Sequence, residues 1–327
     1  MADHAVDDFD GDIFIYRGGR APQHITHARI DKSVDEIMDD AFNGCRILLT
    51  VETHDGIRRV GKRAFYVCKL LRRINLKSAV DIDLHAFYEC DNLESVELGD
   101  RLETIGDGAF FLCYSLKTPL KLPSIITIGD GSFFNCKWLT DIEFSKRLQT
   151  IGKGAFKYCG RLRRIAIPLK RDLFEFSDVH HKYNQFDVCG RLRTVDLVGR
   201  THINETIASL HMESWKTELI AEINQINQVL PNTSRSDKTG EIQQWMALLI
   251  DKMDHYNAEH HRYVKEGMTL LELALWKAKL VEKEEYATEE GKTKKAKVDA
   301  ESTRRERRIT CGADMVIKNV LPFLRLK

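Results

Sequence analysis

Ile105-Gly106-Asp107-Gly108-Ala109-Phe110-Phe111-Leu112-Cys113, followed by Leu116, is one copy of a phrase that recurs through this chain. Its pattern is an apolar residue, often a Gly, then Ala-Phe, two residues, Cys, two residues and Leu. The pattern recurs from Asp35 to Arg200 at intervals of 22 or 23 residues, with one longer interval of 30 before the last copy. Its cysteines are Cys45, Cys68, Cys90, Cys113, Cys136, Cys159 and Cys189. A fixed period of this size predicts stacked supersecondary units.

Each repeat combines two local patterns. After Leu162, the buried-type residues Ile165 and Ile167 alternate with their neighbours, which predicts a short, half-buried strand. The phrase Ala-Phe-x-x-Cys-x-x-Leu instead places apolar residues three apart, which is typical of a helical turn or a short 3₁₀ segment. We therefore expect an α+β fold in which strand, Gly-assisted turn and short helical turn form a coil whose edges are buried by neighbouring copies.

These residues together resemble the BspA-like type of the leucine-rich-repeat family, whose unit carries I-G-x-x-A-F-x-x-C-x-x-L-x-x-I-x-L. The resemblance covers Ile25 to Arg200, with departures at Asp83, Pro119, Ser132 and an insertion around 172–183. It implies a leucine-rich-repeat solenoid of short parallel strands. The function that we expect from it is non-catalytic protein–protein interaction.

Patterns outside the repeat predict further parts of the chain. Ile13–Tyr16 and a second strand near Thr26–Ile30 are expected to form a capping hairpin within residues 1–30, in front of a solenoid at 31–200. After Gly199, apolar residues at three- and four-residue steps predict an α-helical domain at 201–290. Two amphipathic helices are expected, one with apolar residues from Ile203 to Leu230 and one from Ile242 to Tyr256, followed by a third helix. The third, Thr269–Leu280, is apolar on most of its circumference and is expected to be buried.

The end of the chain changes character twice. Residues 291–310 form a basic linker, and 311–327 are expected to form a helix that packs on the third helix. The phrases Leu270-Leu271-Glu272-Leu273-Ala274-Leu275-Trp276 and Cys311-Gly312-Ala313-Asp314 resemble the helical tails of algal BspA-like proteins. Those tails imply no chemistry for this chain.

The composition of the chain limits the functions and locations that we expect for it. A formal net charge of +1 gives no global field that would favour nucleic acid or a membrane. Met1–Asp12 holds five Asp and no apolar run, so we expect no secretory signal and a cytoplasmic, or alternatively nuclear, location. Seven of the eight cysteines occupy one position of the repeat, which favours small buried thiols over disulfides or metal ligands.

The outward positions of the strands are the candidate binding site. In L-x-x-I-x-L the apolar side chains point inward, so the residues between and after them point to solvent. Thr50, Glu52, His54 and Ser145 are expected on this face as well. Interleaved charges favour a polypeptide partner with a complementary pattern, and the alternative is a solvated face without a partner. The residues that we assign to protein binding are Arg73, Asn75, Lys77, Glu97, Asp141, Glu143, Arg164 and Asp196.

Chemical motifs are sparse, and we expect no catalytic, cofactor or metal site. The glycine pairs at Gly106/Gly108, Gly129/Gly131 and Gly152/Gly154 lack the rest of a phosphate-binding loop. His180-His181 and the group His255, His260 and His261 do not have the spacing of a helical metal site. A third class of function, ranked below the other two, is an enzyme whose site lies between the solenoid and the helical domain and contains titratable groups of shifted pKa.

The basic linker supplies the runner-up function, a nucleic-acid-associated or nuclear adaptor. Its two clusters, about ten residues apart, resemble a bipartite nuclear-import signal, and they are also compatible with a solvated linker. No aromatic residue lies between the charges, which weakens the nucleic-acid interpretation. The cations are Lys292, Lys294, Lys295, Lys297, Arg304, Arg305, Arg307 and Arg308.

Overall fold

The chain divides into two compact units. The structure is a computed structural model that describes residues 9–10, 12–174 and 184–289. The first unit, here the solenoid unit, comprises Met1–Thr201 together with Ala221–Ile250, and the second, here the helical unit, comprises His202–Ile220 together with Asp251–Lys327. This partition differs from the expected division at residue 200, because part of the helical sequence belongs to the solenoid unit.

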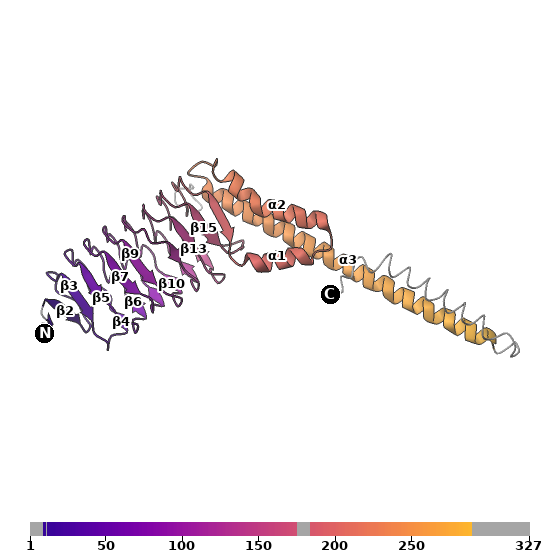
Figure 1. The fold of residues 1–327 in the computed structure, drawn as a ribbon, viewed down its shortest axis with the longest axis horizontal. Coiled ribbons are helices and arrows are strands. Elements are labelled where there is room, and N and C mark those ends of the chain that lie inside the picture. The colour runs from indigo at the N-terminus through magenta and orange to yellow at the C-terminus, as the bar shows by residue number, and fades with distance from the viewer. Residues whose placement is uncertain (1–8, 11, 175–183, 290–327) are drawn as a thin grey trace. The chain divides into compact units, whose positions relative to one another are not determined.

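One set of strands, most of them three or four residues long, lines up on one side of the solenoid, which we call the strand face (Figure 1). They pair in the sheets β1-β2-β3-β5, β7-β9 and β11-β13-β15-β16. Every pair except β1 with β2 is parallel, and Ile165 lies opposite Val195, one turn later. The strands are β1 (Phe9–Asp10), β2 (Ile13–Tyr16), β3 (His27–Ile30), β5 (Thr50–Glu52), β7 (Arg73–Leu76), β9 (Ser95–Leu98), β11 (Leu120–Lys121), β13 (Asp141–Glu143), β15 (Arg164–Ile167) and β16 (Thr194–Leu197).

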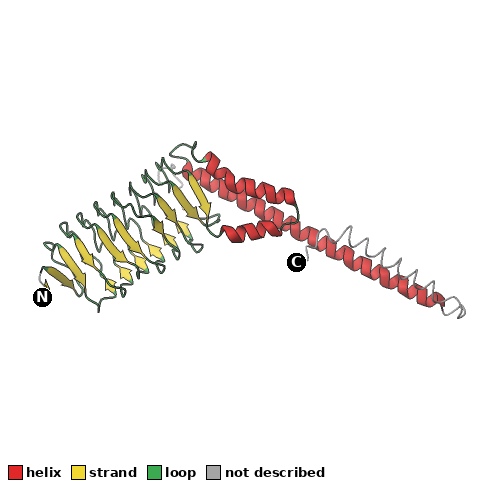
Figure 2. Ribbon diagram, viewed as in Figure 1, coloured by secondary structure: helices red, strands yellow, loops and turns green. Residues whose placement is uncertain are grey.

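A second side of the coil is a continuous parallel sheet of two-residue strands in the order β14-β12-β10-β8-β6-β4. Each strand places one apolar side chain inside, as Ile105 and Ile128 do where they lie opposite each other. Figure 2 shows both sets of strands joined by turns. The strands are β4 (Glu36–Ile37), β6 (Arg59–Val60), β8 (Asp81–Ile82), β10 (Thr104–Ile105), β12 (Thr127–Ile128) and β14 (Thr150–Ile151).

The Ala-Phe-x-x-Cys segment forms consecutive turns instead of a regular 3₁₀ helix. The bonds of 3₁₀ type are present, for example from the Cys113 amide to the Phe110 carbonyl at 3.2 Å. Left-handed residues interrupt them: Leu112 has a φ of 61°. Their amides are thereby free to bond the next turn, and the Leu112 amide donates to the Phe134 carbonyl at 2.9 Å. Turn-to-turn hydrogen bonds thus continue around the third side of the coil.

The interior is built from columns of identical side chains. Phe42, Phe65, Phe87, Phe110, Phe133 and Phe156 are fully buried, and successive rings stack with their centroids 5.0 to 5.2 Å apart. Tyr16 extends this column at its first end and Phe186 at its last. The period of the phrase therefore places its phenylalanines in one buried column.

The expected N-terminal hairpin is wrong in its strand direction. Both strands exist, but Ile13 lies opposite His27 and Tyr16 opposite Ile30, which is a parallel pairing. The segment between them therefore makes a full turn of the coil, and β2 is the first parallel strand of the strand face. The antiparallel partner of β2 is the short strand Phe9–Asp10.

Helices close the last turn of the solenoid unit. Residues 221–250 include the second half of α2 (Glu213–Val229) and the start of α3 (Lys238–Glu289). Asn227 Oδ1 accepts a hydrogen bond from the Val195 amide of β16 at 2.7 Å, and the Lys238 ammonium donates to the Leu192 and Leu230 carbonyls at 2.7 Å each. Because a solenoid needs a cover over its last core layer, this segment acts as the C-terminal cap.

In the helical unit, two of the expected helix boundaries are wrong. The first expected helix is split at 210–212 into α1 (Arg200–Ser209) and α2, and the second and third are one helix of 52 residues, α3. Trp215 stacks on Tyr256 at 5.0 Å. The stretch Thr269–Leu280 is less buried than expected, since Leu273 is 55% and Trp276 64% exposed. Its expected partner, 311–327, lies outside the described residues.

None of the described helices is long and apolar enough to cross a membrane.

Candidate functional site

The alternation of the strands places the candidate residues as predicted. Ile74 and Leu76 of β7 are buried, whereas Arg73 is exposed and Asn75 is half-buried between them. The same pattern leaves Lys77, Glu97 and Glu143 exposed, and Asp141, Arg164 and Asp196 half-buried. One expected position is wrong: Ser145 is buried, because its hydroxyl donates to the Ile125 carbonyl and accepts the Arg147 amide at 2.9 Å.

Opposite charges on the strand face meet between neighbouring turns. Lys77 Nζ lies 2.9 Å from Glu97 Oε2, and the hydrogen bond from this carboxylate raises the pKa of Lys77. Arg164 Nε lies 2.6 Å from Asp196 Oδ2. Four of the eight candidate side chains are therefore engaged in ion pairs within the molecule. Exposed pairs of this kind contribute little to stability, so an incoming charged group can compete for them.

Three candidate charges have no ion-pair partner among the described residues: Arg73, Asp141 and Glu143. The charge of Arg73 acts on the nearby carboxylate of Glu94. The pKa of Glu94 is lowered mainly by Lys117 and further by Arg72 and Arg73. Asp141 lies opposite Arg164 and Glu143 opposite Lys121 in the sheet register, without forming a bridge to either. These three charges are the part of the strand face most available to a partner.

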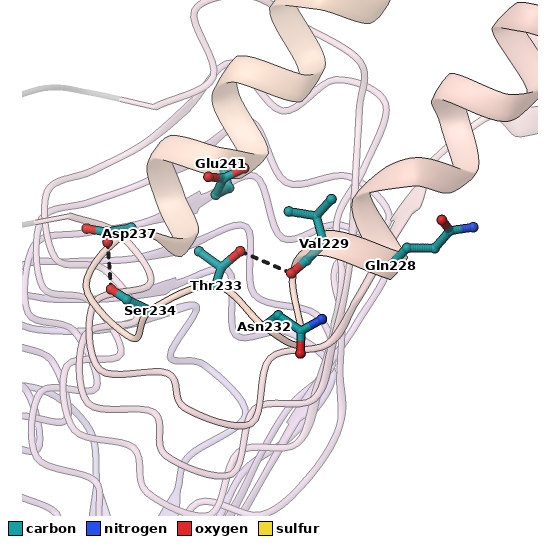
Figure 3. Close-up of a pocket in the computed structure, with 7 residues that line it drawn as sticks. All are labelled: Gln228, Val229, Asn232, Thr233, Ser234, Asp237 and Glu241. Atoms are coloured by element: carbon teal, nitrogen blue, oxygen red, sulfur yellow. Dashed lines mark hydrogen bonds between the residues drawn. The ribbon is translucent and has the colours of Figure 1, made fainter.

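A hollow at the turn between α2 and α3 has a volume of about 500 Å³ (Figure 3). Its polar groups support the helix ends: Thr233 Oγ1 donates to the Val229 carbonyl at 3.2 Å, and Ser234 Oγ donates to Asp237 Oδ2 at 2.6 Å. The lining contains no His, Cys or Lys. The arrangement is that of helix capping rather than of a nucleophile with its base.

The other residues singled out in the sequence for metal binding or charge lie partly within the described residues and partly outside them. Within the described residues, no three His, Cys, Asp or Glu side chains are placed to hold a metal ion. His260 lies beside His211, with ring centroids 5.8 Å apart, in an aromatic cluster of the helical unit. His180-His181, all cations of the basic linker from Lys292 to Arg308, and Cys311 lie outside the described residues.

The glycines of the repeat have two distinct structural roles. Gly108, Gly131 and Gly154 adopt a left-handed φ of 57° to 61°. At Gly129, a Cβ atom would lie 2.5 Å from the backbone nitrogen of Asp107 in the preceding turn. In the first role, glycine adopts a left-handed conformation that is unfavourable for other residues. In the second, it lets neighbouring turns stack closely, so neither role is a phosphate-binding feature.

The seven cysteines of the repeat form a second buried column. The Cys136 thiol donates to the Phe110 carbonyl at 3.2 Å, and its equivalents repeat this contact in successive turns. Burial raises the pKa of Cys45 to about 11 and that of Cys189 to about 12. Cys45 and Cys189 therefore stay protonated at neutral pH, which makes them poor nucleophiles and poor metal ligands.

We expect the seven column thiols to resist labelling in the native protein. At pH 8 a thiol reagent should modify them only as fast as the solenoid unit unfolds, because all seven sulfur atoms are buried and out of its reach. The raised pKa values also predict a dependence of stability on pH. Above about pH 8.5 the thiols of the unfolded chain lose their protons while the buried thiols of the folded protein keep theirs, so the free energy of unfolding falls as pH rises. Rapid labelling of all eight cysteines without denaturant would contradict the prediction.

One family model and several solved structures are similar to this chain. A family model described as "BspA type Leucine rich repeat region (6 copies)" matches residues 21–120, 78–178 and 118–206. A leucine-rich-repeat protein of Treponema pallidum is 23% identical, covering 56% of this chain and 73% of its own, with a TM-score of 0.37. One from Bacteroides ovatus is 25% identical, covering 53% of this chain and 55% of its own, with a TM-score of 0.41.

No curated protein matches the sequence. The family model nevertheless spans more than half of the chain, and the buried phenylalanine and cysteine columns lie within the residues that it matches. The chain therefore belongs to the family of BspA-type leucine-rich-repeat proteins.

Proposed function

We propose that this protein is a non-catalytic scaffold whose strand face binds a polypeptide partner. The observation that carries the proposal is the set of three solvent-accessible charges without ion-pair partners among the described residues, Arg73, Asp141 and Glu143. They are fixed on parallel strands, so a partner meets them without a cost for ordering the backbone. Leucine-rich-repeat scaffolds typically serve protein interaction, which supports the same function.

The mixed signs favour a polypeptide over nucleic acid on this face. A nucleic-acid surface requires a stripe of Lys and Arg, whereas this face presents acids at Asp141 and Glu143 and a cation at Arg73. A protein with a complementary pattern gains specificity from such interleaved charges, and like charges on a wrong partner are repelled. The affinity is expected to be moderate, because exposed charges are partly screened by salt.

The test is a charge reversal, Asp141→Lys with Glu143→Lys, in the full-length chain. Stability should change by no more than about 0.5 kcal/mol, because both side chains are at the surface. A partner captured with the wild-type chain should bind the reversed variant at least about tenfold more weakly, as measured by titration. The matched control replaces Arg304, Arg305, Arg307 and Arg308 by Ala and should leave that affinity unchanged. If the control loses the partner and the reversed variant keeps it, the basic linker is the binding surface.

A further inference from the structure

Four exposed arginines, here the arginine patch, gather at the edge of the last two turns. Arg161 and Arg163 flank the buried Leu162, and Arg191 and Arg193 occupy the same two positions of the following turn. The two turns are directly stacked, because the Arg193 amide donates to the Arg163 carbonyl at 3.0 Å. Arginine therefore lies next to arginine in both columns.

Earlier turns do not place like charges together at these positions. The column of Arg163 and Arg193 holds Leu49, Arg72, Glu94, Lys117 and Thr140 in the preceding turns. Where charges are adjacent there, they have opposite signs, and Lys117 Nζ lies 2.7 Å from Glu94 Oε2. Like charges on directly opposed positions of neighbouring strands are destabilising. The arginine patch thus carries an electrostatic cost that no contact among the described residues offsets.

No acid compensates the patch within the described part of the chain. None of the four arginines forms an ion pair there, although Arg164, the next residue after Arg163, pairs with Asp196. The pKa of the buried Lys238 is lowered chiefly by burial and in part by the charge of Arg193. The positive field of the patch therefore reaches the capping helices.

Two neighbours extend and orient the patch. The guanidinium carbon of Arg161 lies 3.4 Å from the ring centroid of Trp138, a cation–π contact that restricts the side chain. The exposed Arg235, from the turn between α2 and α3, lies against the last turn: a Cβ atom on Gly190 would be 3.0 Å from its Nε. A fifth cation from a distant part of the sequence thus joins the same edge of the solenoid unit.

We propose that the arginine patch binds an acidic polypeptide segment rich in Asp and Glu. The planar fork of arginine matches a carboxylate with two parallel hydrogen bonds, and such a ligand relieves the repulsion between the stacked guanidinium groups. This surface is distinct from the strand face, although Arg163 and Arg193 directly precede β15 and β16. The proposal does not depend on the strand-face function.

Two observations favour a polypeptide over single-stranded nucleic acid. Proteins that bind single strands offer open aromatic faces on which bases stack. At the patch, the guanidinium of Arg161 already lies over the ring of Trp138. The four arginines also span only two turns, whose core rings Phe156 and Phe186 are 5.6 Å apart, so the surface suits a short run of carboxylates rather than a long backbone track.

The experiment titrates the full-length chain against a fluorescent oligoglutamate peptide and an oligothymidylate of equal length, followed by anisotropy at low and physiological salt. Replacing Arg161, Arg163, Arg191 and Arg193 by Gln should weaken peptide binding at least about tenfold. The variant should keep or raise its thermal midpoint, because like-charge repulsion is removed. Replacing all four by Lys keeps the charge but loses the fork, and should give an intermediate affinity.

The matched control replaces Arg46, Arg58, Arg72 and Arg101, which are exposed and have no ion-pair partner in the described residues, by Gln. The net charge changes equally, yet peptide affinity should stay within about twofold. Equal losses in both quadruple variants, or no peptide binding by the wild type, would overturn the patch. Tighter binding of the oligothymidylate through the same four arginines would overturn the polypeptide as its ligand.

Discussion

Replacing Phe110 by alanine is expected to lower the free energy of unfolding of the solenoid unit by about 3–5 kcal/mol. The ring is fully buried, and it stacks on Phe87 and Phe133 with centroids 5.1 Å away on each side. Truncation removes both contacts and leaves a cavity that rigid neighbouring turns cannot fill. Denaturant unfolding measures the change, provided that the transition of the solenoid unit is followed separately from that of the helical unit.

The next residue in the sequence provides the control. Phe111 also stacks on its equivalents, at 4.9 Å from Tyr88 and 4.5 Å from Phe134, but on the outside of the turn where it is partly exposed. Phe111→Ala removes stacking without creating an internal cavity and should cost about 1 kcal/mol. An unfolding midpoint for Phe110→Ala that equals the wild type, or a smaller loss than for Phe111→Ala, would rule out the column as a source of stability.

The second large effect is expected from Gly129→Ala, which should destabilise the solenoid unit by about 2–3 kcal/mol. The added Cβ atom would lie 2.5 Å from the Asp107 nitrogen and 2.6 Å from the Gly106 carbonyl carbon. Both are backbone atoms of a neighbouring turn that is itself held by hydrogen bonds, such as that from the Gly129 amide to the Ile105 carbonyl at 2.8 Å. The turns must separate to make room.

Gly131→Ala separates this clash from backbone strain. The position is left-handed, with a φ of 57°, but an added Cβ atom would meet its nearest neighbour in Phe111 at 3.5 Å. Arg63 and His85 occupy the equivalent position of other turns with similar φ values. The cost should therefore be only about 1 kcal/mol. Thermal unfolding compares the two variants, and an equal loss in both would contradict the close-stacking explanation.

Local pattern was sufficient for the interior of the solenoid. The period places every Phe and Cys of the phrase at one position of a repeating unit, so one inference about burial holds for all copies. Alternation in the strands likewise predicted that Arg73, Lys77 and Glu143 face solvent. It was wrong for Ser145, because a hydroxyl that bonds the Ile125 carbonyl of a neighbouring turn gives no periodic signal.

Contacts between segments that are far apart in the sequence could not be predicted from local pattern. The direction of Ile13–Tyr16 relative to His27–Ile30 depends on the path of the chain between them, and a strand pattern is the same for both directions. The helical sequence after Gly199 showed its amphipathicity, but not that Asn227 and Lys238 would bond the last strand and its preceding turn. The merging of two expected helices into α3 shows that a polar interruption need not end a helix, even where the apolar residues beyond it, such as Leu273 and Trp276, are exposed.

The repeat, its family and the inward columns were predictable without a structure, because these follow from side chains at fixed intervals along one chain. The tertiary structure decided which charges meet. Lys77 pairs with Glu97 and Arg164 with Asp196, whereas Asp141, Glu143 and the arginine patch have no such partner in the described residues. Ion pairs depend on distances of a few ångströms between turns, and stacking brings together residues that are 20 and 32 positions apart in the sequence in these two pairs.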